Sequence, residues 1–226
     1  MRNDKYNYSL NGIEHEIILN DKIKIEQKPI NEKILISNKY MIKYINDLFD
    51  YNSIEYSFIG DSLLGIYIFN GINIFNNKIE ICTLDTNFYK IKKLEDEIKK
   101  DDFNIYFNEK NIKISTVFFD NVKTHIYIYP LVNDTINDLL NYVTIDNLLI
   151  SHHFYDIFPI KKTIFEEFQV SVPNKIEKVL ETYNFNLNYI SFTKKKNDNK
   201  KIIEEIDVKQ SLIGNFISII KPFLFV

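Results

Sequence analysis

The segment from Glu55 to Leu84 constrains the fold of this chain more than any other part of the sequence. It opens with EYSFIG, a short run of strand-forming residues that ends in glycine, and continues as the apolar run DSLLGIYIF. KIEICTL then alternates polar and apolar residues in the manner of a strand. The order predicts a strand, a glycine turn, a helix that Asp61 or Ser62 caps, and a second strand.

The polar residues of this segment lie where a ligand would meet such a unit. Backbone amides at a helix N-terminus bind phosphate, which makes Gly60, Asp61 and Ser62 candidate phosphate-binding residues. On a strand, residues two positions apart share a face, and carboxylates with this spacing can hold a divalent metal ion. The second strand carries Lys78 and Glu80 at such positions. The segment is therefore a candidate nucleotide or phosphate site, in which Lys78 could pair with Glu80 or with a bound phosphate.

Flanking segments predict further helices and strands. Apolar residues at helical spacing begin near Ser37, and strand-like runs lie between Phe103 and Tyr129. The residues from Ile13 to Glu26 alternate around Asn20-Asp21, which indicates a hairpin. The remaining expectations are an amphipathic helix capped by Thr86, a helix over Asn133 to Tyr142, paired strands from Lys161 to Pro173, and a helix capped by Asn174.

Length and composition narrow the class of protein. We expect one α+β domain, mixed α/β in character, with a mixed sheet flanked by helices, because 226 residues of which 45% are apolar can bury a large core. A net charge of −3 gives no basic field for nucleic acid. Cys82 is the only cysteine, which excludes an intrachain disulfide. No apolar run is long enough to span a bilayer, and we expect a cytoplasmic protein.

The core segment resembles that of the LicD and fukutin-related family. THIYIYPL and the run from Ile157 to Tyr183 also resemble segments of this family. The resemblance implies a nucleotidyltransferase fold over residues 37–190, with a hairpin-like extension over 1–36 and a charged loop and apolar element over 191–226. The residues of the core segment that agree in register are Gly60, Ser62, Leu63, Leu64, Gly65, Gly71, Ile79 and Ile81.

The resemblance also implies a chemistry, and the sequence departs from the family at the residues that would perform it. Family members transfer a phospho-alcohol, of the phosphocholine or ribitol phosphate type, from a CDP-linked donor to a glycan. Alternate aspartates of the strand hold the divalent metal for that reaction. Of those positions only Glu80 remains acidic in this chain. The departures from the family motif are Ile68, Asn76, Asn77, Lys78 and Tyr127.

Of these departures, Lys78 bears most on the function, and three hypotheses remain open. An ammonium group at the centre of a Mg²⁺ site repels the ion and cannot ligate it. The first hypothesis is a non-catalytic homologue that needs no cofactor and binds a CDP-linked nucleotide, a glycan or a protein partner. The second is an active phosphotransferase in which Glu80 and Asp61 hold Mg²⁺ or Mn²⁺ and act as the catalytic carboxylates. The third is a structural or assembly component whose cleft is filled by side chains.

Other residues are weaker candidates for a functional site. Lys161 and Lys162 could contact an anionic ligand, although a solvated lysine is the commoner case. His152 and His153 are adjacent, so on a strand they face opposite sides and do not share a metal. Cys82 is expected to be a packing residue. The apolar segment from Ser211 to Val226 is a candidate surface for a protein partner.

Overall fold

The structure is a computed structural model, and it describes residues 4–10, 13–19, 30–73, 76–118, 121–183, 191–194 and 205–206. The chain divides into two compact units. The larger unit comprises residues 30–184, and the smaller one joins residues 1–29 to 185–226. The candidate site residues all fall in the larger unit.

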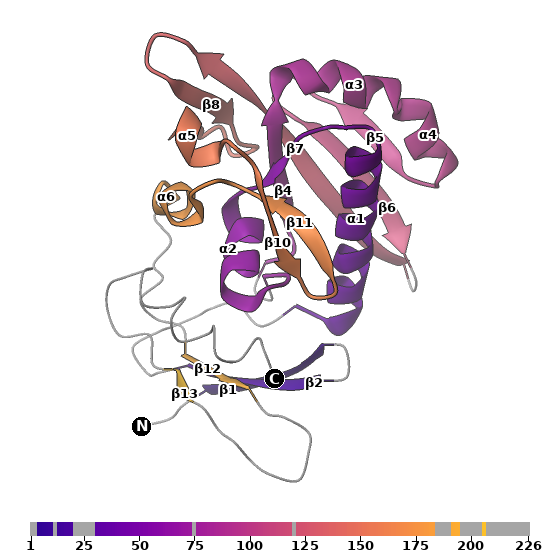
Figure 1. Cartoon of the computed structure of the whole chain (residues 1–226). Helices are drawn as coiled ribbons and strands as arrows, with labels where there is room; N and C mark the ends of the chain where they lie inside the picture. Colours follow the sequence, from indigo (N-terminus) through magenta and orange to yellow (C-terminus); the bar gives the residue numbers. More distant parts are fainter. Residues whose placement is uncertain are drawn as a thin grey trace. The chain divides into compact units, whose positions relative to one another are not determined.

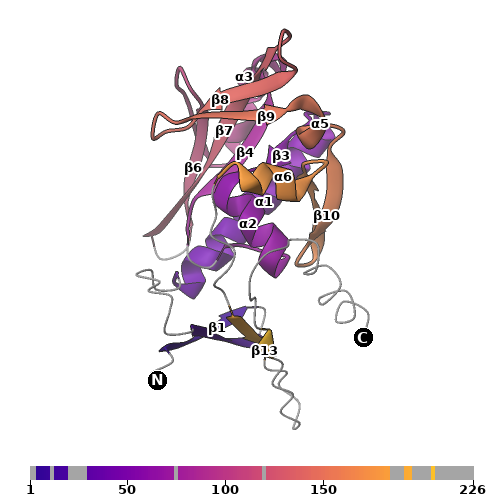
Figure 2. The same cartoon turned by 90° about the vertical axis from the view of Figure 1, so that its left-hand side faces the viewer.

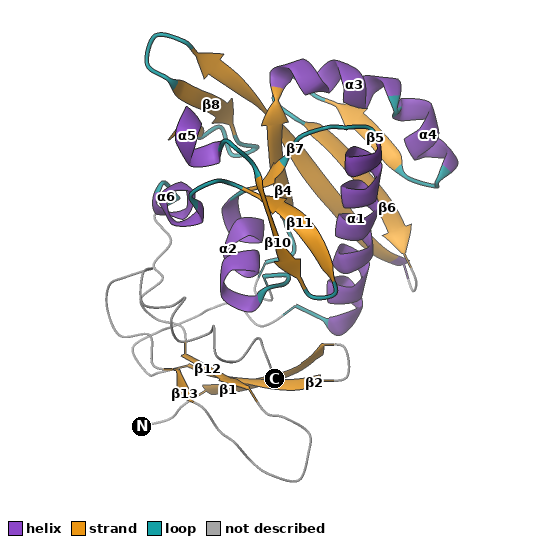
Figure 3. Cartoon of the chain, viewed as in Figure 1, coloured by secondary structure: helices purple, strands orange, loops and turns teal. Residues whose placement is uncertain are grey.

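A mixed sheet forms the middle of the larger unit (Figures 1 and 3). The strand order is β3-β4-β7-β6-β5, and β8 pairs with the far end of β7 and with β9. The pair β4–β7 is parallel, whereas β3–β4, β7–β6 and β6–β5 are antiparallel. The strands are β3 (Ser57–Phe58), β4 (Ile79–Leu84), β5 (Asn104–Phe107), β6 (Ile112–Phe118), β7 (Val122–Asp134), β8 (Leu139–Val143) and β9 (Leu149–His153).

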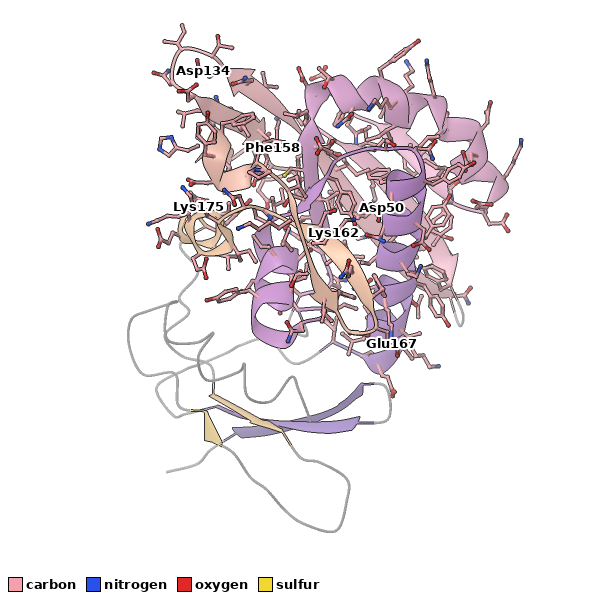
Figure 4. All side chains as sticks on the ribbon, viewed as in Figure 1. Asp50, Asp134, Phe158, Lys162, Glu167 and Lys175 are labelled. Atoms are coloured by element: carbon pink, nitrogen blue, oxygen red, sulfur yellow. The ribbon has the colours of Figure 1, made fainter. Side chains whose placement is uncertain are left out.

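Helices and a hairpin flank this sheet. The long helix α1 (Glu32–Tyr51) packs on one face, where Thr124 of β7 donates a hydrogen bond from its hydroxyl to Asn38 Oδ1. The hairpin of β10 (Lys161–Phe165) and β11 (Phe168–Val172) is tied to α1 by Lys162, whose Nζ lies 2.7 Å from Asp50 Oδ1 (Figure 4). The other helices are α2 (Gly60–Phe69), η1 (Asp85–Asn87), α3 (Phe88–Lys93), α4 (Glu95–Lys100), α5 (Phe154–Ile157) and α6 (Ile176–Glu181).

The two faces of the sheet differ in character. Isoleucine side chains that are almost wholly buried point toward α1 from the three central strands, and they form much of the core. The opposite side carries Glu80 of β4, Tyr127 of β7 and Lys113 of β6, which are direct partners in neighbouring strands and therefore share a face. We call this side the polar face. The buried isoleucines are Ile79, Ile81, Ile112, Ile114, Ile126 and Ile128.

Several sequence predictions are confirmed. The strand, turn, helix and strand of the opening segment are β3, α2 and β4, and the mixed sheet flanked by helices is present. The strand-like runs between Phe103 and Tyr129 form β5, β6 and the first part of β7. The paired strands that end at Pro173 are the β10–β11 hairpin. Met41 and Ile45 lie on the buried side of α1, as their spacing predicts.

The predicted helix over Asn133 to Tyr142 is wrong. These residues form the end of β7, a turn and then β8. The physical reason lies in Asp134, whose Oδ1 accepts from the backbone N–H of Ile136 while its Oδ2 accepts from Asn137 Nδ2. A side chain that caps its own turn competes with helical hydrogen bonds, so the chain reverses instead of continuing as a helix.

The predicted helix caps also need correction. The first helix begins at Glu32 and not near Ser37, because Asn31 caps it by accepting from the backbone N–H of Lys33 at 2.8 Å. Helix α2 has Ile59 at its N-cap, so Asp61 and Ser62 lie inside its first turn. The other corrections are a 3₁₀ turn before α3 in place of a Thr86 cap, a break at Leu94, and Lys175 in place of Asn174 as the N-cap of α6.

The smaller unit contains a sheet in the order β1-β2-β12-β13. Strand β2 pairs with β1 on one edge and with β12 on the other, while the turn and second arm of the hairpin predicted around Asn20-Asp21 lie outside the described residues. The segments 20–29, 195–204 and 207–226, with the predicted charged loop and apolar tail, lie outside the described residues. The strands are β1 (Asp4–Leu10), β2 (Ile13–Leu19), β12 (Ser191–Lys194) and β13 (Glu205–Ile206).

Within the described part of the chain, no helix is both long enough and apolar enough to cross a membrane.

Candidate functional site

Gly60 brings the main chain into direct contact with the carboxylate of Glu80. Gly60 is buried and has φ +57°, a left-handed conformation that glycine adopts at little cost. A Cβ atom at this position would lie 2.5 Å from Glu80 Oε2. The turn between β3 and α2 therefore requires glycine for two reasons, and it leaves no space between the backbone and that carboxylate oxygen.

Ser62 joins α2 to β4. Its Oγ donates to the carbonyl oxygen of Lys78 at 3.1 Å and accepts from the backbone N–H of Glu80 at 2.8 Å. The side chain is buried. Its two hydrogen bonds satisfy the backbone carbonyl of Lys78 and the backbone N–H of Glu80, next to the short strand β3. The predicted phosphate-binding hydroxyl is thus engaged within the protein.

Asp61 lies among amide side chains. Its Oδ1 accepts from Asn73 Nδ2 at 3.4 Å, and its Oδ2 accepts from Asn76 Nδ2. Asn76 also accepts, through Oδ1, from the backbone N–H of Lys78 at 2.9 Å. Burial raises the pKa of Asp61, while the charge of Lys78 and the hydrogen bond from Asn76 lower it by smaller amounts. Both carboxylate oxygens of Asp61 therefore accept hydrogen bonds from amide side chains.

Glu80 is similarly engaged. The hydroxyl of Tyr129 donates to Glu80 Oε1 at 3.2 Å. Burial raises the pKa of Glu80 most, and the nearby charge of Asp61 raises it further, against lowering effects from Lys78 and the Tyr129 hydrogen bond. Asp61 and Glu80 thus lie close enough to repel each other, and the ammonium of Lys78 partly offsets that repulsion.

This arrangement does not fit a divalent metal ion. The carboxylate oxygens of Asp61 and the Oε1 of Glu80 accept hydrogen bonds from protein donors, and Lys78 brings a positive charge to both groups. In the part of the chain that the structure describes, no group of three or more His, Cys, Asp or Glu side chains could hold a metal. A Mg²⁺ ion here would have to compete with these donors for the carboxylate oxygens and would be repelled by the ammonium of Lys78.

We call Asp61, Lys78 and Glu80 the cluster. Positively charged side chains and aromatic rings lie next to it on the polar face. Lys113 Nζ lies 5.7 Å from the ring centroid of Tyr127, and the rings of His125 and Tyr127 meet edge to face at 5.0 Å. Burial lowers the pKa of His125, and the charges of Lys113 and Lys78 lower it further. Both ammonium groups therefore lie near one imidazole, and all four side chains are only partly buried.

Tyrosine rings fill the other side of the cluster, next to Gly60. Tyr129 and Tyr142 are buried, with ring centroids 5.3 Å apart, and the hydroxyls of Tyr142 and Tyr183 share a hydrogen bond. A Cβ on Gly60 would also lie 3.9 Å from Cε1 of Tyr183. The rings thus occupy the space beside the turn that the sequence predicted as a phosphate cradle.

A buried histidine lies against these rings. His152 packs 5.9 Å from Tyr183 between ring centroids, and burial lowers its pKa to about 4. Its Nδ1 lies 3.4 Å from Thr182 Oγ1, while its Nε2 has no hydrogen-bond partner among the described residues. His153 is exposed, so the two neighbours face opposite sides, as predicted.

The remaining predicted residues lie apart from the cluster or inside the fold. Lys161 donates to the carbonyl oxygen of Asn174 at 2.8 Å, and Lys162 pairs with Asp50, so both lysines serve the β10–β11 hairpin. Cys82 is buried in the packing of β4. Asn77 is exposed, and the side chain of Ile68 is outside the described residues.

Sequence reasoning missed some residues that surround the cluster. Lys113 lies on a correctly predicted strand, and its place opposite Tyr127 follows only from the β6–β7 register. Asp146 lies in the turn between β8 and β9, where its Oδ2 is 3.5 Å from Lys78 Nζ. No signal in the sequence predicts that Asp146 lies beside Lys78, because the apolar spacing of the preceding segment fits a helix and not the strand β8. Tyr183 follows α6 and meets the cluster only through the tertiary fold.

Comparison with solved structures gives distant likenesses, among them one to an antibiotic-modifying enzyme. The crystal structure of lincosamide antibiotic adenylyltransferase LnuA with lincomycin bound matches at a TM-score of 0.39 and 15% sequence identity, over 68% of this chain and 86% of that chain. No protein-family model matches the sequence, and a search of curated proteins gives no match. A likeness of this extent assigns neither a family nor an activity.

Proposed function

We propose that this chain is a LicD-like protein of the nucleotidyltransferase type that catalyses no transfer and binds a phosphate-bearing ligand, foremost a nucleotide, without a metal ion. One observation carries the proposal. The two carboxylates that would have to hold a metal, Asp61 and Glu80, are hydrogen-bonded to Asn73, Asn76 and Tyr129. The order of β3, α2 and β4 supports the family resemblance, since it matches the arrangement that the resemblance implies.

Lys78 supports the metal-independent part of the proposal. A metal in a phosphotransferase neutralises the charge of the donor's phosphates, and a lysine ammonium can pair with a phosphate as a point charge. The side chain of Lys78 is 36% exposed, so a ligand from solvent can reach it. The charge of Lys78 lowers the pKa of both Asp61 and Glu80, so its ammonium lies near enough to the residual carboxylates to act on them.

A second candidate function is a structural or assembly component with a filled cleft. The observation in its favour is the packing of Tyr142 and Tyr183 beside Gly60, where a phosphate cradle would otherwise lie. In that case the chain would bind no nucleotide, and its partner would be another protein. The segment 211–226 is proposed as the surface for such a partner.

A thermal-shift experiment separates these functions. The melting temperature is measured with CDP-choline, CDP-ribitol and CTP, each with Mg²⁺, with Mn²⁺ and with EDTA. The proposal expects stabilisation that is the same in EDTA, because binding adds to stability without help from a metal. Stabilisation only with metal, together with transfer from a CDP-linked donor that Glu80→Gln abolishes, would establish an active phosphotransferase. The absence of any shift would favour the structural component.

A further inference from the structure

The turn between β8 and β9 reaches over the polar face. Asp146 Oδ2 lies 3.5 Å from Lys78 Nζ, and Asn147 Oδ1 accepts a hydrogen bond from Lys110 Nζ. Figure 2 shows β8 and β9 running across β7. Residues 144–148, which we call the strap, therefore carry a carboxylate to the side of the sheet where Lys78 and Lys113 lie.

The contact between Asp146 and Lys78 is open to solvent. The two side chains are 67% and 36% exposed, and the 3.5 Å separation is longer than that of a charge-assisted hydrogen bond. Ion pairs of this kind are weak because water screens them. An anion with more charge and more oxygen atoms than one carboxylate can therefore replace Asp146 at Lys78.

The residues beside this contact suit a ligand that carries both phosphate and an aromatic ring. Lys113 brings a second ammonium, and it lies over the ring of Tyr127 at 5.7 Å from the centroid. Tyr127 and His125 are partly exposed, and their edge-to-face contact fixes the orientation of the two rings. Bases stack on aromatic side chains in proteins that bind single-stranded nucleic acid without sequence preference, and the base of a nucleotide presents the same flat face.

We propose that a nucleotide binds on the polar face with its phosphates at Lys78 and Lys113 and its base against Tyr127, and that Asp146 occupies the phosphate position until the ligand displaces it. The inference rests on the proposed function and adds the residues that hold the ligand and the residue that competes with it. Binding would release the strap from Lys78, while the hydrogen bonds of β8 to β7 hold the rest of the hairpin in place.

Calorimetric titration of the full chain in EDTA tests this inference. The probes are CTP, pyrophosphate and cytidine. Asp146→Asn removes the competing charge, and Asp138→Asn is its matched control, because it makes the same change in an exposed residue at the other end of β8. Lys113→Met removes one proposed phosphate contact, and the control Lys92→Met makes the same substitution at an exposed position on α3, away from the proposed site.

We expect Asp146→Asn to tighten CTP and pyrophosphate binding by about 2- to 5-fold, the range of an exposed ion pair, and to leave cytidine unchanged. Lys113→Met should weaken CTP by about 5-fold or more, and both controls should match the unsubstituted chain. If CTP binds but Asp146→Asn equals Asp138→Asn, the competing role of Asp146 is wrong while the proposed function stands. If no variant binds CTP or pyrophosphate, both are wrong.

Discussion

The hydroxyl of Tyr129 on β7 donates a hydrogen bond to the carboxylate of Glu80 on the neighbouring strand β4, at 3.2 Å. The two residues meet because β4 and β7 run parallel and place Glu80 next to Tyr127 and Cys82 next to Tyr129. Tyr129 is wholly buried, so this contact holds the one acidic residue left in the family motif against the protein interior. The carboxylate is a structural acceptor in this arrangement.

Glu80→Gln is predicted to change the pH dependence of stability. Burial and Asp61 raise the pKa of Glu80 in the folded chain above its ordinary value of 4.5. The folded state therefore holds this proton more tightly than the unfolded state, and stability falls as pH rises from 4.5 through the raised pKa. Urea unfolding between pH 4 and 8 should show a smaller decrease in the free energy of unfolding for Glu80→Gln than for the unsubstituted chain. The control Glu55→Gln, at an exposed position, should show the same decrease as the unsubstituted chain. Parallel curves for all three chains would contradict this account of Glu80.

His152→Phe is predicted to remove an opposite pH dependence. Burial lowers the pKa of His152 from 6.5 to about 4, so the unfolded chain binds the proton first as pH falls through this window. The folded state should lose on the order of 3 kcal/mol between pH 6.5 and 4 through this residue. The difference in free energy of unfolding between His152→Phe and the unsubstituted chain should grow by that order in favour of the variant. His153→Asn, at an exposed position, should leave the slope unchanged.

Gly65→Ala and Gly60→Ala are both predicted to lower the free energy of unfolding, for different physical reasons. A Cβ on Gly65 would lie 2.3 Å from the backbone nitrogen of Asn73, and backbone cannot move aside easily. Overpacking of this kind costs about 1–3 kcal/mol or more. At Gly60 the close atom belongs to a side chain, and the left-handed conformation costs about 1–2 kcal/mol.

A double-mutant cycle checks the physical reason. In a Glu80→Ala background, the cost of Gly60→Ala should fall by about 1 kcal/mol, because the clashing oxygen is gone. The cost of Gly65→Ala should not change in that background. Equal costs of Gly60→Ala with and without Glu80 would show that the carboxylate does not press on the turn as the structure has it.

Part of this fold follows from local signals in the sequence. The unit β3–α2–β4 was predictable because Gly60 marks the turn and the residues of Lys78 to Leu84 alternate. The helix over Asn133 to Tyr142 was not, since its apolar spacing fits a helix and only the side-chain contacts of Asp134 reverse the chain. Local propensity is a weak guide where a polar side chain can cap a turn.

Only those residues of the candidate site that belong to the family motif were predictable from the sequence. Asp61, Lys78 and Glu80 belong to one segment of the sequence, where the turn, the strand spacing and the family resemblance all point to them. Tyr129 and Tyr183 reach the same place from a distant strand and from the end of α6, and no periodicity foretells which carboxylate a tyrosine will contact. The engagement of both carboxylates is therefore a tertiary property, set by strand register and packing.

Calorimetric titration of the chain with CTP, once in EDTA and once in Mg²⁺, tests the metal-independent site most directly. The account predicts dissociation constants that agree within about twofold in the two buffers, and a loss of about tenfold in Lys78→Met in both, because one ammonium-to-phosphate contact is removed. Binding that requires Mg²⁺, survives Lys78→Met and disappears in Glu80→Gln would contradict it.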